Sequence, residues 1–319
     1  MKILFTSVGR RVELMQAFRK AADDLEIDLT IIGADITESA PALYFCDETR
    51  IVCRIKDTNY IPQLLEICKE DQIDCLIPTI DTDLLLLAEN KTKFEAIGTK
   101  VLISAVDKVK LCRDKRFTAD YFISLGLKSP QPVDDVESYD MGYPAFIKPK
   151  DGSSSIDAYK VMNEDDLRTY ASKIADYIIQ PFISGREFTI DIFCDYEGNP
   201  VFITPRERMT VRAGEVSKTR ICQDDVMIAE MKTLIADYKP CGQITVQLIQ
   251  DENTGDNYYI EINPRFGGGA PLSMKAGADS AEAVIRMLRG EKLDYVEKAA
   301  RDQAIYSRFD QSVCVYEGV

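Results

Sequence analysis

The chain has 319 residues, of which 45% are hydrophobic and 29% charged, a composition typical of a globular protein rather than a disordered or fibrous one. Its formal net charge of −14 repels phosphate backbones and anionic lipids, which argues against a nucleic acid or a membrane as partner. Histidine is absent, which excludes a Ser-His-Asp triad and every histidine-ligated metal site. Any catalysis must therefore use Lys, Arg, acidic and amide side chains, the backbone, or a hard metal ion bound by oxygen.

Cysteine usage and the N-terminus indicate the compartment. The nine cysteines are scattered and no two form a Cys-x-x-Cys pair, so we expect reduced thiols rather than a zinc or iron–sulfur site. The opening segment is predicted to be a short strand that runs into Arg10 and Arg11, unlike a signal peptide. No apolar run approaches the roughly 20 residues that a membrane span needs. We therefore expect a soluble, cytoplasmic protein.

Strand and helix patterns alternate through residues 1–105. Strands are expected over 3–6, 29–34, 75–78 and 100–103, and helices over 12–22, 60–69 and 83–90. This alternation predicts a parallel sheet covered by helices, a small Rossmann-like domain. A dinucleotide site is rejected, because the first strand–helix turn has the single glycine Gly9 and Gly-x-Gly-x-x-Gly is absent. Arg10 and Arg11 form either an anion site at the start of the first helix or solvated surface.

A mixed α+β pattern follows over residues 106–300. A polar helix is predicted over 107–125. Further strands are predicted over 144–148, 158–161, 177–180, 187–194, 201–204, 243–250 and 258–263, and further helices over 165–176, 226–238 and 280–288. The tail 301–319 carries no chemical signature. The sequence therefore predicts two domains and a C-terminal tail.

The strongest chemical signal lies in residues 259–269. Glu261 and Asn263 are two positions apart on a predicted strand, so both side chains point to one face. A carboxylate and an amide oxygen there suit Mg²⁺, and Gln247 on the neighbouring strand can join them. Arg265 follows, ready for a phosphate or a carboxylate, and the glycines after it allow close approach of a ligand to the backbone. The alternative is a solvated face that ends in a proline turn.

A second signal is a lysine at the end of an apolar strand, followed by small residues. Lys148 supplies a point charge for an anion. Hydroxyls and backbone amides that can surround phosphates follow in the loop Gly152, Ser153, Ser154 and Ser155. The Walker A pattern is absent. Taken alone, such a loop is more often a plain connection.

A third signal is an apolar strand that passes through a turn into a second strand. The turn consists of Gln180, Pro181, Phe182 and Ile183. Main-chain groups of such a hinge can pair with an adenine edge while apolar side chains enclose the ring. Glu187, at the start of the next strand, can accept ribose hydroxyls. The alternative is a connector with a solvated acid.

The order of these signals along the chain resembles the ATP-grasp superfamily, and more narrowly its carbamoyl-phosphate synthase large-chain-like branch. The resemblance covers roughly residues 107–290 and implies a two-lobed α+β ATP-grasp domain over 106–300, with a lid over about 117–182. The Rossmann-like segment is similar to that family's pre-ATP-grasp domain. The chain has no second ATP-grasp half and no amidotransferase signature, so complete carbamoyl-phosphate synthesis is not expected.

The resemblance also implies roles for single residues. Lys115 and Lys148 match two lysines that bind the phosphates of ATP, and Glu187 matches the ribose ligand. The adenine hinge would be Gln180, Pro181, Phe182 and Ile183, and the ligands of Mg²⁺ or Mn²⁺ would be Gln247, Glu261 and Asn263. Arg265 matches an arginine that steadies the transferring phosphoryl group. The implied reaction makes an acyl phosphate from a small carboxylate and passes it to an amine.

A basic segment interrupts the acidic chain and is predicted to bind the carboxylate substrate, together with the backbone at Gly268. Its members are Arg206, Arg208, Arg212, Lys218 and Arg220. Surface ion pairs are the alternative for these side chains. For the whole chain, the alternatives are a catalytically inactive ATP-binding regulatory or scaffold protein and a partial carbamoyl-phosphate-synthase-like kinase subunit. A homodimer is left open.

Overall fold

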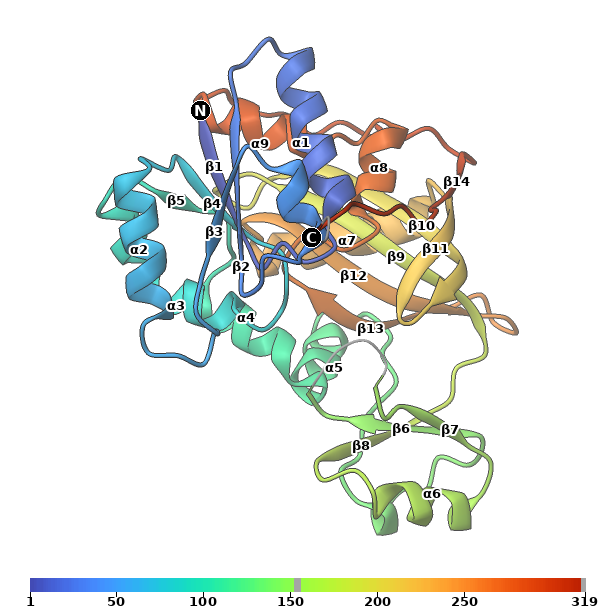
Figure 1. The fold of residues 1–319 in the computed structure, drawn as a ribbon. Helices are drawn as coiled ribbons and strands as arrows, with labels where there is room; N and C mark the ends of the chain where they lie inside the picture. Colours follow the sequence, from blue (N-terminus) through green and yellow to red (C-terminus); the bar gives the residue numbers. More distant parts are fainter. Residues whose placement is uncertain (152–155, 317–319) are drawn as a thin grey trace.

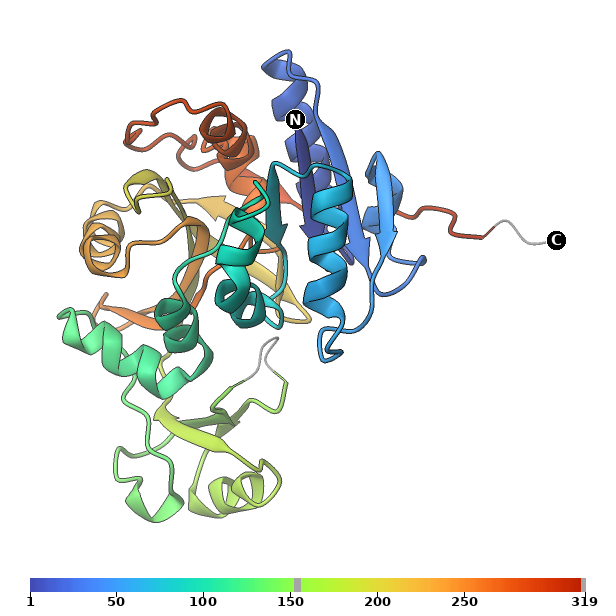
Figure 2. The same cartoon turned by 90° about the vertical axis from the view of Figure 1, so that its left-hand side faces the viewer.

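The computed structural model describes residues 1–151 and 156–316 and is organised by three β-sheets (Figure 1). A five-stranded sheet forms the first domain. A six-stranded and a three-stranded sheet form the remainder. Figure 2 shows the three-stranded sheet and its helix as a small lobe that hangs below the rest of the molecule. The architecture is thus an α/β domain followed by a two-lobed α+β domain, as expected.

The first domain is a parallel sheet in the order β3-β2-β1-β4-β5. Its strands are β1 (Lys2–Thr6), β2 (Thr30–Asp35), β3 (Glu48–Ile51), β4 (Cys75–Pro78) and β5 (Lys100–Val101). Helix α1 (Val12–Asp24) and the 3₁₀ helix η1 (Pro41–Phe45) pack on one face, and α2 (Tyr60–Glu70) and α3 (Leu84–Glu95) on the other. The inner strands are apolar on both sides because helices cover both faces. The sequence did not predict β3, an edge strand with alternating exposure.

The single helix predicted over 107–125 is wrong. The structure has two helices, α4 (Val106–Arg113) and α5 (Lys115–Ser124). Asp114 between them has an extended backbone, and its side chain accepts a hydrogen bond from the Arg116 amide at 2.9 Å. An aspartate in this position caps and starts a new helix. Phe122 of α5 packs on Tyr259 of the large sheet, with ring centroids 5.2 Å apart, so we propose that the small lobe begins after α5 rather than at residue 117.

The small lobe is an antiparallel sheet in the order β7-β6-β8 with one covering helix. Its elements are η2 (Val136–Ser138), β6 (Ala145–Pro149), β7 (Tyr159–Val161), α6 (Glu164–Ala171) and β8 (Tyr177–Pro181). It has its own hydrophobic core, which includes Ile147, Leu167 and Ile179. The predicted phosphate loop, residues 152–155, lies outside the described residues.

The large sheet is antiparallel in the order β13-β12-β9-β10-β11-β14. Its strands are β9 (Gly185–Cys194), β10 (Pro200–Arg212), β11 (Glu215–Ile221), β12 (Gly242–Asp251), β13 (Asn257–Asn263) and β14 (Ile305–Ser307). Helix α7 (Asp225–Tyr238) buries one face. Helices α8 (Ala270–Ala276) and α9 (Ser280–Leu288) lie between the other face and the first domain (Figure 1). The sequence missed α8, β11, β14 and the second half of β10.

One hydrophobic core joins the first domain to the large sheet. Phe18 of α1 makes edge contacts with Phe5 at 4.9 Å and with Phe266 at 5.9 Å between ring centroids. The same core includes residues from α8 and α9. Burial of aromatic surface on both sides of the junction fixes the first domain against the glycine turn that follows β13.

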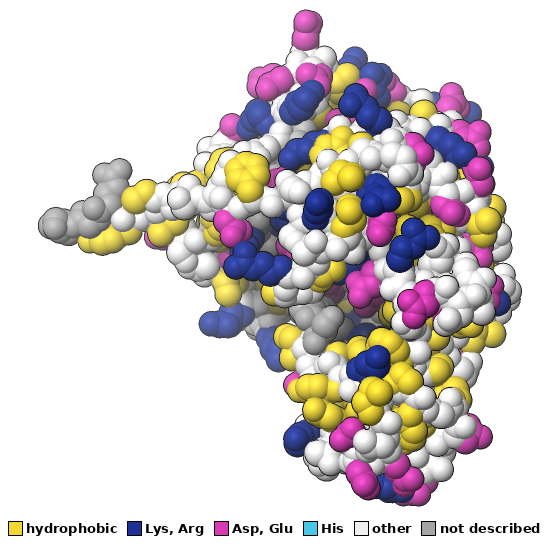
Figure 3. Space-filling view, turned by 90° about the vertical axis from the view of Figure 1, so that its right-hand side faces the viewer, with side chains coloured by type: hydrophobic (Ala, Val, Ile, Leu, Met, Phe, Trp, Pro, Cys, Tyr) yellow, Lys and Arg dark blue, Asp and Glu magenta, His cyan; other side chains and the backbone are white. Residues whose placement is uncertain are grey.

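The C-terminal tail contributes to the fold although its sequence has no motif. Strand β14 pairs with β11, and Arg308 binds Glu13 of α1 and Glu215 of β11, both at 3.0 Å. Beyond it the tail extends away from the body with exposed apolar side chains (Figure 3). All nine cysteines are free. Among the helices of the described segments, none combines the length and apolarity needed to traverse a lipid bilayer.

Candidate nucleotide and metal site

Strand register collects polar side chains on one face of the large sheet. Partners that face each other across antiparallel strands share a face, and the side-chain period is two. One row across β13, β12, β9 and β10 is therefore Glu261, Gln247, Thr189 and Arg206, and the next is Asn263, Thr245, Asp191 and Thr204. The opposite face carries the apolar residues under α7. The two residues of the Glu-x-Asn pair and Gln247 thus lie side by side, as the spacing predicted.

A cavity of about 600 Å³ lies between this face and the small lobe. Figure 3 shows the molecule hollowed between the small lobe at the bottom and the body above it. The polar residues that line the cavity are Lys115, Lys148, Asp151, Glu187, Arg208, Gln247 and Glu261. Its apolar lining includes Phe146, Ala158, Leu248, Ile249 and Ile260. The size and the division into apolar and charged parts suit a nucleotide.

Two lysines meet Glu261 in this cavity. Lys148 on β6 is 7% exposed, and burial lowers the pKa of its ammonium to about 8. The positive charge of Lys115 also lowers this pKa, whereas the negative charge of Glu261 raises it. Burial likewise lowers the pKa of Lys115, at the start of α5, although Glu261 opposes the shift. Two largely buried ammonium groups therefore converge on one side of the cavity, where they suit the binding of a polyphosphate.

The oxygen donors at the sheet end fit a hard divalent cation. Asn263 Nδ2 donates a hydrogen bond to Glu261 Oε1 at 2.9 Å, and Gln247 is the register partner of Glu261. Mg²⁺ binds through one or two carboxylates together with waters and phosphates, so this set is sufficient if Asn263 turns its oxygen inward. Within residues 1–151 and 156–316, no three His, Cys, Asp or Glu side chains are grouped to hold a metal by themselves. A metal here would therefore depend on the nucleotide.

The predicted adenine hinge does not line the cavity, whereas the predicted ribose ligand does. Gln180 is 5% exposed and its Nε2 donates to the Pro130 carbonyl at 2.5 Å, so this side chain holds the hinge in place. The Phe182 amide donates to the Pro144 carbonyl at 3.1 Å. Glu187 does line the cavity, where it accepts a hydrogen bond from Arg208 at 3.2 Å. None of residues 180–183 is among the described residues that line it.

The basic segment predicted to bind substrate is not one site. Arg206 and Arg208 share the polar face, and their register partners on β11 are Ile221 and Thr219. Lys218 and Arg220 alternate with these two residues along β11 and therefore lie on the other face. Arg220 is near Glu207 at 3.8 Å, and the exposed Arg212 pairs with Asp310 at 3.2 Å. Arg208 contacts Glu187, Thr189 and the Gly214 carbonyl inside the nucleotide cavity. A linear charge count could not show that alternate residues of a strand point apart.

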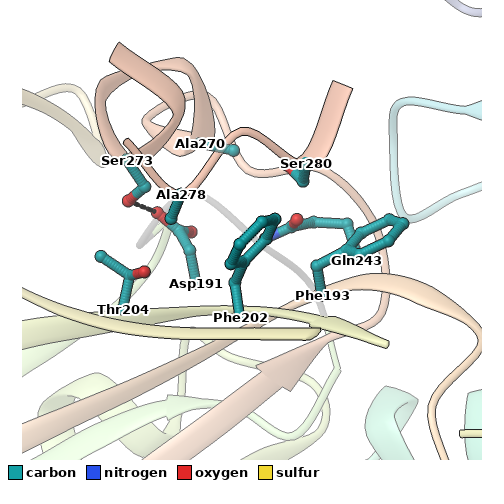
Figure 4. A pocket seen from close by; sticks show the side chains of 9 residues that line it. All are labelled: Asp191, Phe193, Phe202, Thr204, Gln243, Ala270, Ser273, Ala278 and Ser280. Carbon is teal, nitrogen blue, oxygen red and sulfur yellow. Dashed lines mark hydrogen bonds between the residues drawn. The ribbon is translucent and has the colours of Figure 1, made fainter. Parts of the chain in front are cut away.

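Arg206 is a structural residue in this fold. Its side chain is 2% exposed and its Nε donates to Asp191 at 2.7 Å. Figure 4 shows Ser273 of α8 pointing at the same carboxylate, at 2.6 Å, beside a small cavity of about 10 Å³. A Cβ on Gly269 would lie 2.6 Å from Arg206 Nη2, so the guanidinium supports the glycine turn from below. We therefore propose that Arg206 supports the fold rather than binding a substrate.

Arg265 has a partner that the sequence did not reveal. Its Nη2 bonds Asp81 of the first domain at 2.7 Å. Asp81 lies in the loop that follows β4, and Arg11, from the loop after β1, lies against Gly268. The sequence did hold one indication of this meeting. Arg11 and Asp81 both follow the carboxyl ends of predicted parallel strands, and this is the edge of such a sheet where ligands bind. Arg265 thus meets the first domain, and Gly268 lies between Arg11 of the first domain and Glu215 of β11.

Comparison with known proteins agrees with this geometry. Residues 3–102 match the family model of the PylC-like N-terminal domain, and residues 112–269 match that of the ATP-grasp domain. Together these two matches span most of the chain. The chain therefore contains an ATP-grasp domain behind a PylC-like N-terminal domain, and the predicted fold class and family resemblance are confirmed.

Two curated relatives and one solved structure illustrate the likeness. The N-terminal section of carbamoyl phosphate synthase large chain from Aquifex aeolicus is 25% identical over 81% of this chain and 52% of its own length. The 3-methyl-D-ornithine–L-lysine ligase of Methanosarcina acetivorans is 22% identical over 95% and 76%. The MgADP-bound biotin carboxylase domain of Hydrogenobacter thermophilus 2-oxoglutarate carboxylase has a TM-score of 0.74 at 19% identity, covering 95% and 73%. The chain spans about half the length of the first two carbamoyl phosphate synthase relatives.

Proposed function

We propose that the chain is an ATP- and Mg²⁺-dependent ligase that phosphorylates a small carboxylate and transfers the resulting acyl group to an amine, releasing ADP and phosphate. The observation that supports it most is the meeting of Lys115, Lys148 and Glu261 in a cavity of nucleotide size. The name of the Methanosarcina acetivorans relative is that of such an amide-forming ligase.

The residues perform this reaction by positioning and charge neutralisation, because phosphoryl transfer asks little of a protein base. Lys115 and Lys148 bind the phosphates, and Arg265 stabilises charge that develops on the transferred group. Mg²⁺, held by Glu261, Asn263 and Gln247, would supply further neutralisation at the phosphates. The apolar lining encloses the adenine and excludes water from the acyl phosphate.

Arg208 takes a nucleotide role in this proposal rather than the substrate role expected from the sequence. It is 9% exposed in its side chain and holds Glu187, the proposed ribose ligand, at 3.2 Å. Its three contacts fix the direction of the Glu187 carboxylate before the ribose arrives. This pre-organisation lowers the entropy lost when ATP binds.

The direct test is ADP release with ATP, Mg²⁺ and pools of carboxylates and amines. A ligase releases ADP only when a suitable carboxylate is present, and more rapidly once the amine is added. MgADP protection in a thermal melt reports separately on the nucleotide site. If MgADP protects the protein but no pool stimulates ADP release, the scaffold alternative is favoured and the ligase proposal fails.

The depressed pKa of Lys148 predicts that nucleotide affinity falls as pH rises. In the folded protein this ammonium is lost around pH 8, whereas an ordinary lysine keeps it to about 10.5. Phosphates bind the charged form, so the Kd for MgADP should rise several-fold between pH 7 and 9.5. Below pH 8 Lys148 is charged in both the folded and the unfolded chain, so its burial destabilises the folded state in full. Between pH 8 and 10.5 it is neutral only in the folded chain, so the free energy of unfolding of the ligand-free protein should rise with pH in this range.

Lys148→Arg is the matched control for this pH profile, because a guanidinium stays charged throughout the range. Calorimetric titration of MgADP into both proteins across the pH series measures the effect. The Kd for MgADP should rise less with pH in Lys148→Arg than in the wild type. A smaller rise should remain, because the pKa of Lys115 is also lowered. Identical slopes in the two proteins would contradict the assignment.

A further inference from the structure

The hairpin formed by β10 and β11 projects past its neighbour β9 in the large sheet. Among the described strands, β10 pairs with β9 only as far as Glu207 and continues beyond this point with β11 alone. The loop of the hairpin consists of Ala213 and Gly214, with φ angles of 49° and 77°. Positive φ at both positions is the conformation of a two-residue type I′ turn. Residues 208–217, which we call the hairpin tip, therefore extend from the edge of the packed sheet.

The hairpin tip forms part of the wall of the nucleotide cavity. Val211 and Gly214 line this cavity, together with Arg208 at the base of the tip. Arg208 Nη2 donates a hydrogen bond to the Gly214 carbonyl at 3.0 Å, and Arg208 Nε donates to Glu187 at 3.2 Å. The position of the tip therefore affects where Arg208 holds Glu187, the proposed ribose ligand.

The pairing between β10 and β11 is irregular within the tip. The register shifts between Arg208 and Thr210, and again between Thr210 and Val211. A β-bulge interrupts the ladder and bends the strand that carries it. Ala213 also has a left-handed backbone, which is unfavourable for a residue with a side chain. Because the ladder of the hairpin holds the tip weakly, contacts from outside the hairpin help to decide where the tip lies.

The C-terminal segment 305–308 supplies such contacts. Strand β14 pairs with β11 at the outer edge of the large sheet (Figure 1), and the Arg308 amide donates to the Ser217 carbonyl at 2.8 Å. The Arg308 side chain reaches further along β11. Its Nη1 bonds Glu215 Oε2 at 3.0 Å and the Val216 carbonyl at 3.2 Å. Arg308 thus binds successive residues of β11 directly after the turn of the hairpin.

Arg308 is anchored to the body of the protein as well as to the hairpin. Its Nε donates to Glu13 of α1 at 3.0 Å, and Glu13 also accepts a bond from Lys275 of α8 at 2.7 Å. Tyr306 donates from its hydroxyl to the Lys275 carbonyl at 3.2 Å. A guanidinium can join two acids and a carbonyl at once because its donors form a rigid, planar fork. Arg308 therefore connects the tip to helices that pack against the first domain and the large sheet.

A second arginine contacts the same acid of the hairpin. Arg11 Nη1 bonds Glu215 Oε1 at 3.1 Å, so Glu215 keeps a partner when the Arg308 side chain is removed. The bond from Arg308 to the Val216 carbonyl and the link to Glu13 would be lost. We therefore expect removal of this side chain to shift the tip rather than release it, and to weaken nucleotide binding by a moderate factor.

We propose that Arg308 is a positioning residue of the nucleotide site, which acts through the hairpin tip on Arg208 and thereby on the contact between Glu187 and the ribose. The inference rests on the proposed function for the identity of the nucleotide and the role of Glu187. It gives a part in nucleotide recognition to a segment whose sequence carries no chemical motif. The link is a continuous series of hydrogen bonds from Arg308 to Glu187 through the backbone of the tip.

The test compares the Kd of MgADP with that of the magnesium complex of 2′,3′-dideoxy-ADP, which lacks the hydroxyls that Glu187 would bind. Calorimetry measures both in the full-length wild type and in Arg308→Gln. The wild type should bind MgADP more tightly than the dideoxy compound. Arg308→Gln should raise the Kd for MgADP about fivefold and that for the dideoxy compound less than about twofold. The variant should therefore lose most of the preference for the ribose hydroxyls.

Arg286→Gln is the matched control, because Arg286 also bridges two glutamates, Glu282 and Glu291, but does so at α9. It should keep the wild-type Kd for both nucleotides. Arg308→Lys retains the charge without the planar fork, so its preference for MgADP should lie between those of the wild type and Arg308→Gln. Thermal melts confirm that each variant is folded.

Glu215→Gln examines the same link from the hairpin side and carries the test if Arg308→Gln does not fold. It should weaken MgADP binding at least as much as Arg308→Gln, and the double variant should lose less than the product of the two single effects. The proposal is overturned if the folded variants keep the wild-type preference, or if the Kd values for both nucleotides rise equally. Failure of the wild type to bind MgADP would overturn the proposed function as well, whereas unchanged variants of a wild type that binds MgADP count against this inference alone.

Discussion

Glu261→Gln should lower the rate of ADP release by about 100-fold or more while leaving the protein folded. Glu261 is the only carboxylate among the three proposed metal donors, and Gln247 and Asn263 are neutral amides. Removing its charge leaves the cation held by amides and phosphates alone, and it removes the anion that opposes the shifts at Lys148 and Lys115. The affinity for Mg²⁺ should therefore fall together with kcat.

The measurement is ADP release as a function of Mg²⁺ concentration, once a stimulating substrate pool is known, and before that the Mg²⁺ dependence of ADP binding. Glu252→Gln, in the exposed turn between β12 and β13, is the matched control and should behave as the wild type. If Glu261→Gln keeps the Mg²⁺ dependence of the wild type, the metal donors lie elsewhere and the assignment built on the Glu-x-Asn pair is lost.

Arg206→Ala should destabilise the protein by about 3–5 kcal/mol, because it leaves the Asp191 carboxylate buried without its cation. The two side chains are 2% and 4% exposed and joined at 2.7 Å, and Ser273 and Thr245 share the same carboxylate. This effect distinguishes a structural arginine from the substrate ligand that the sequence suggested. Equilibrium urea unfolding measures it.

Arg212→Ala is the comparison, since its ion pair with Asp310 is 79% exposed on both sides and contributes less than about 1 kcal/mol. Replacing both partners, as Arg206→Met with Asp191→Leu, should recover much of the loss because no charge is then left unpaired. A normal urea midpoint for Arg206→Ala, together with a raised KM for the carboxylate substrate, would restore the substrate role and refute the structural one.

The residues that sequence reasoning placed well are those whose roles follow from local periodicity. Two-residue spacing put Glu261 and Asn263 on one face of a strand, and apolar runs located β1, β4, α7 and α9 to within a residue or two. The helix over 107–125 was wrong because hydrophobic pattern continues across Asp114, where a single capping side chain divides it. Strands β3 and β14 were missed because edge strands are half exposed, so their pattern is that of a loop. Strand β11 lies between β10 and β14, but it is also partly exposed and carries charges, which hid it in the same way.

What the sequence determined by itself is the class of chemistry: a histidine-free chain with lysines, a Glu-x-Asn pair and an arginine in a fixed order, on alternating elements that predict the fold. What only the tertiary structure decided is which charges meet. The separation of Arg206 from Arg220, and the contacts of Arg265 with Asp81 and of Arg11 with Gly268, depend on strand register and on packing of one domain against another. Register and packing join residues more than a hundred positions apart, and no local pattern records such distances.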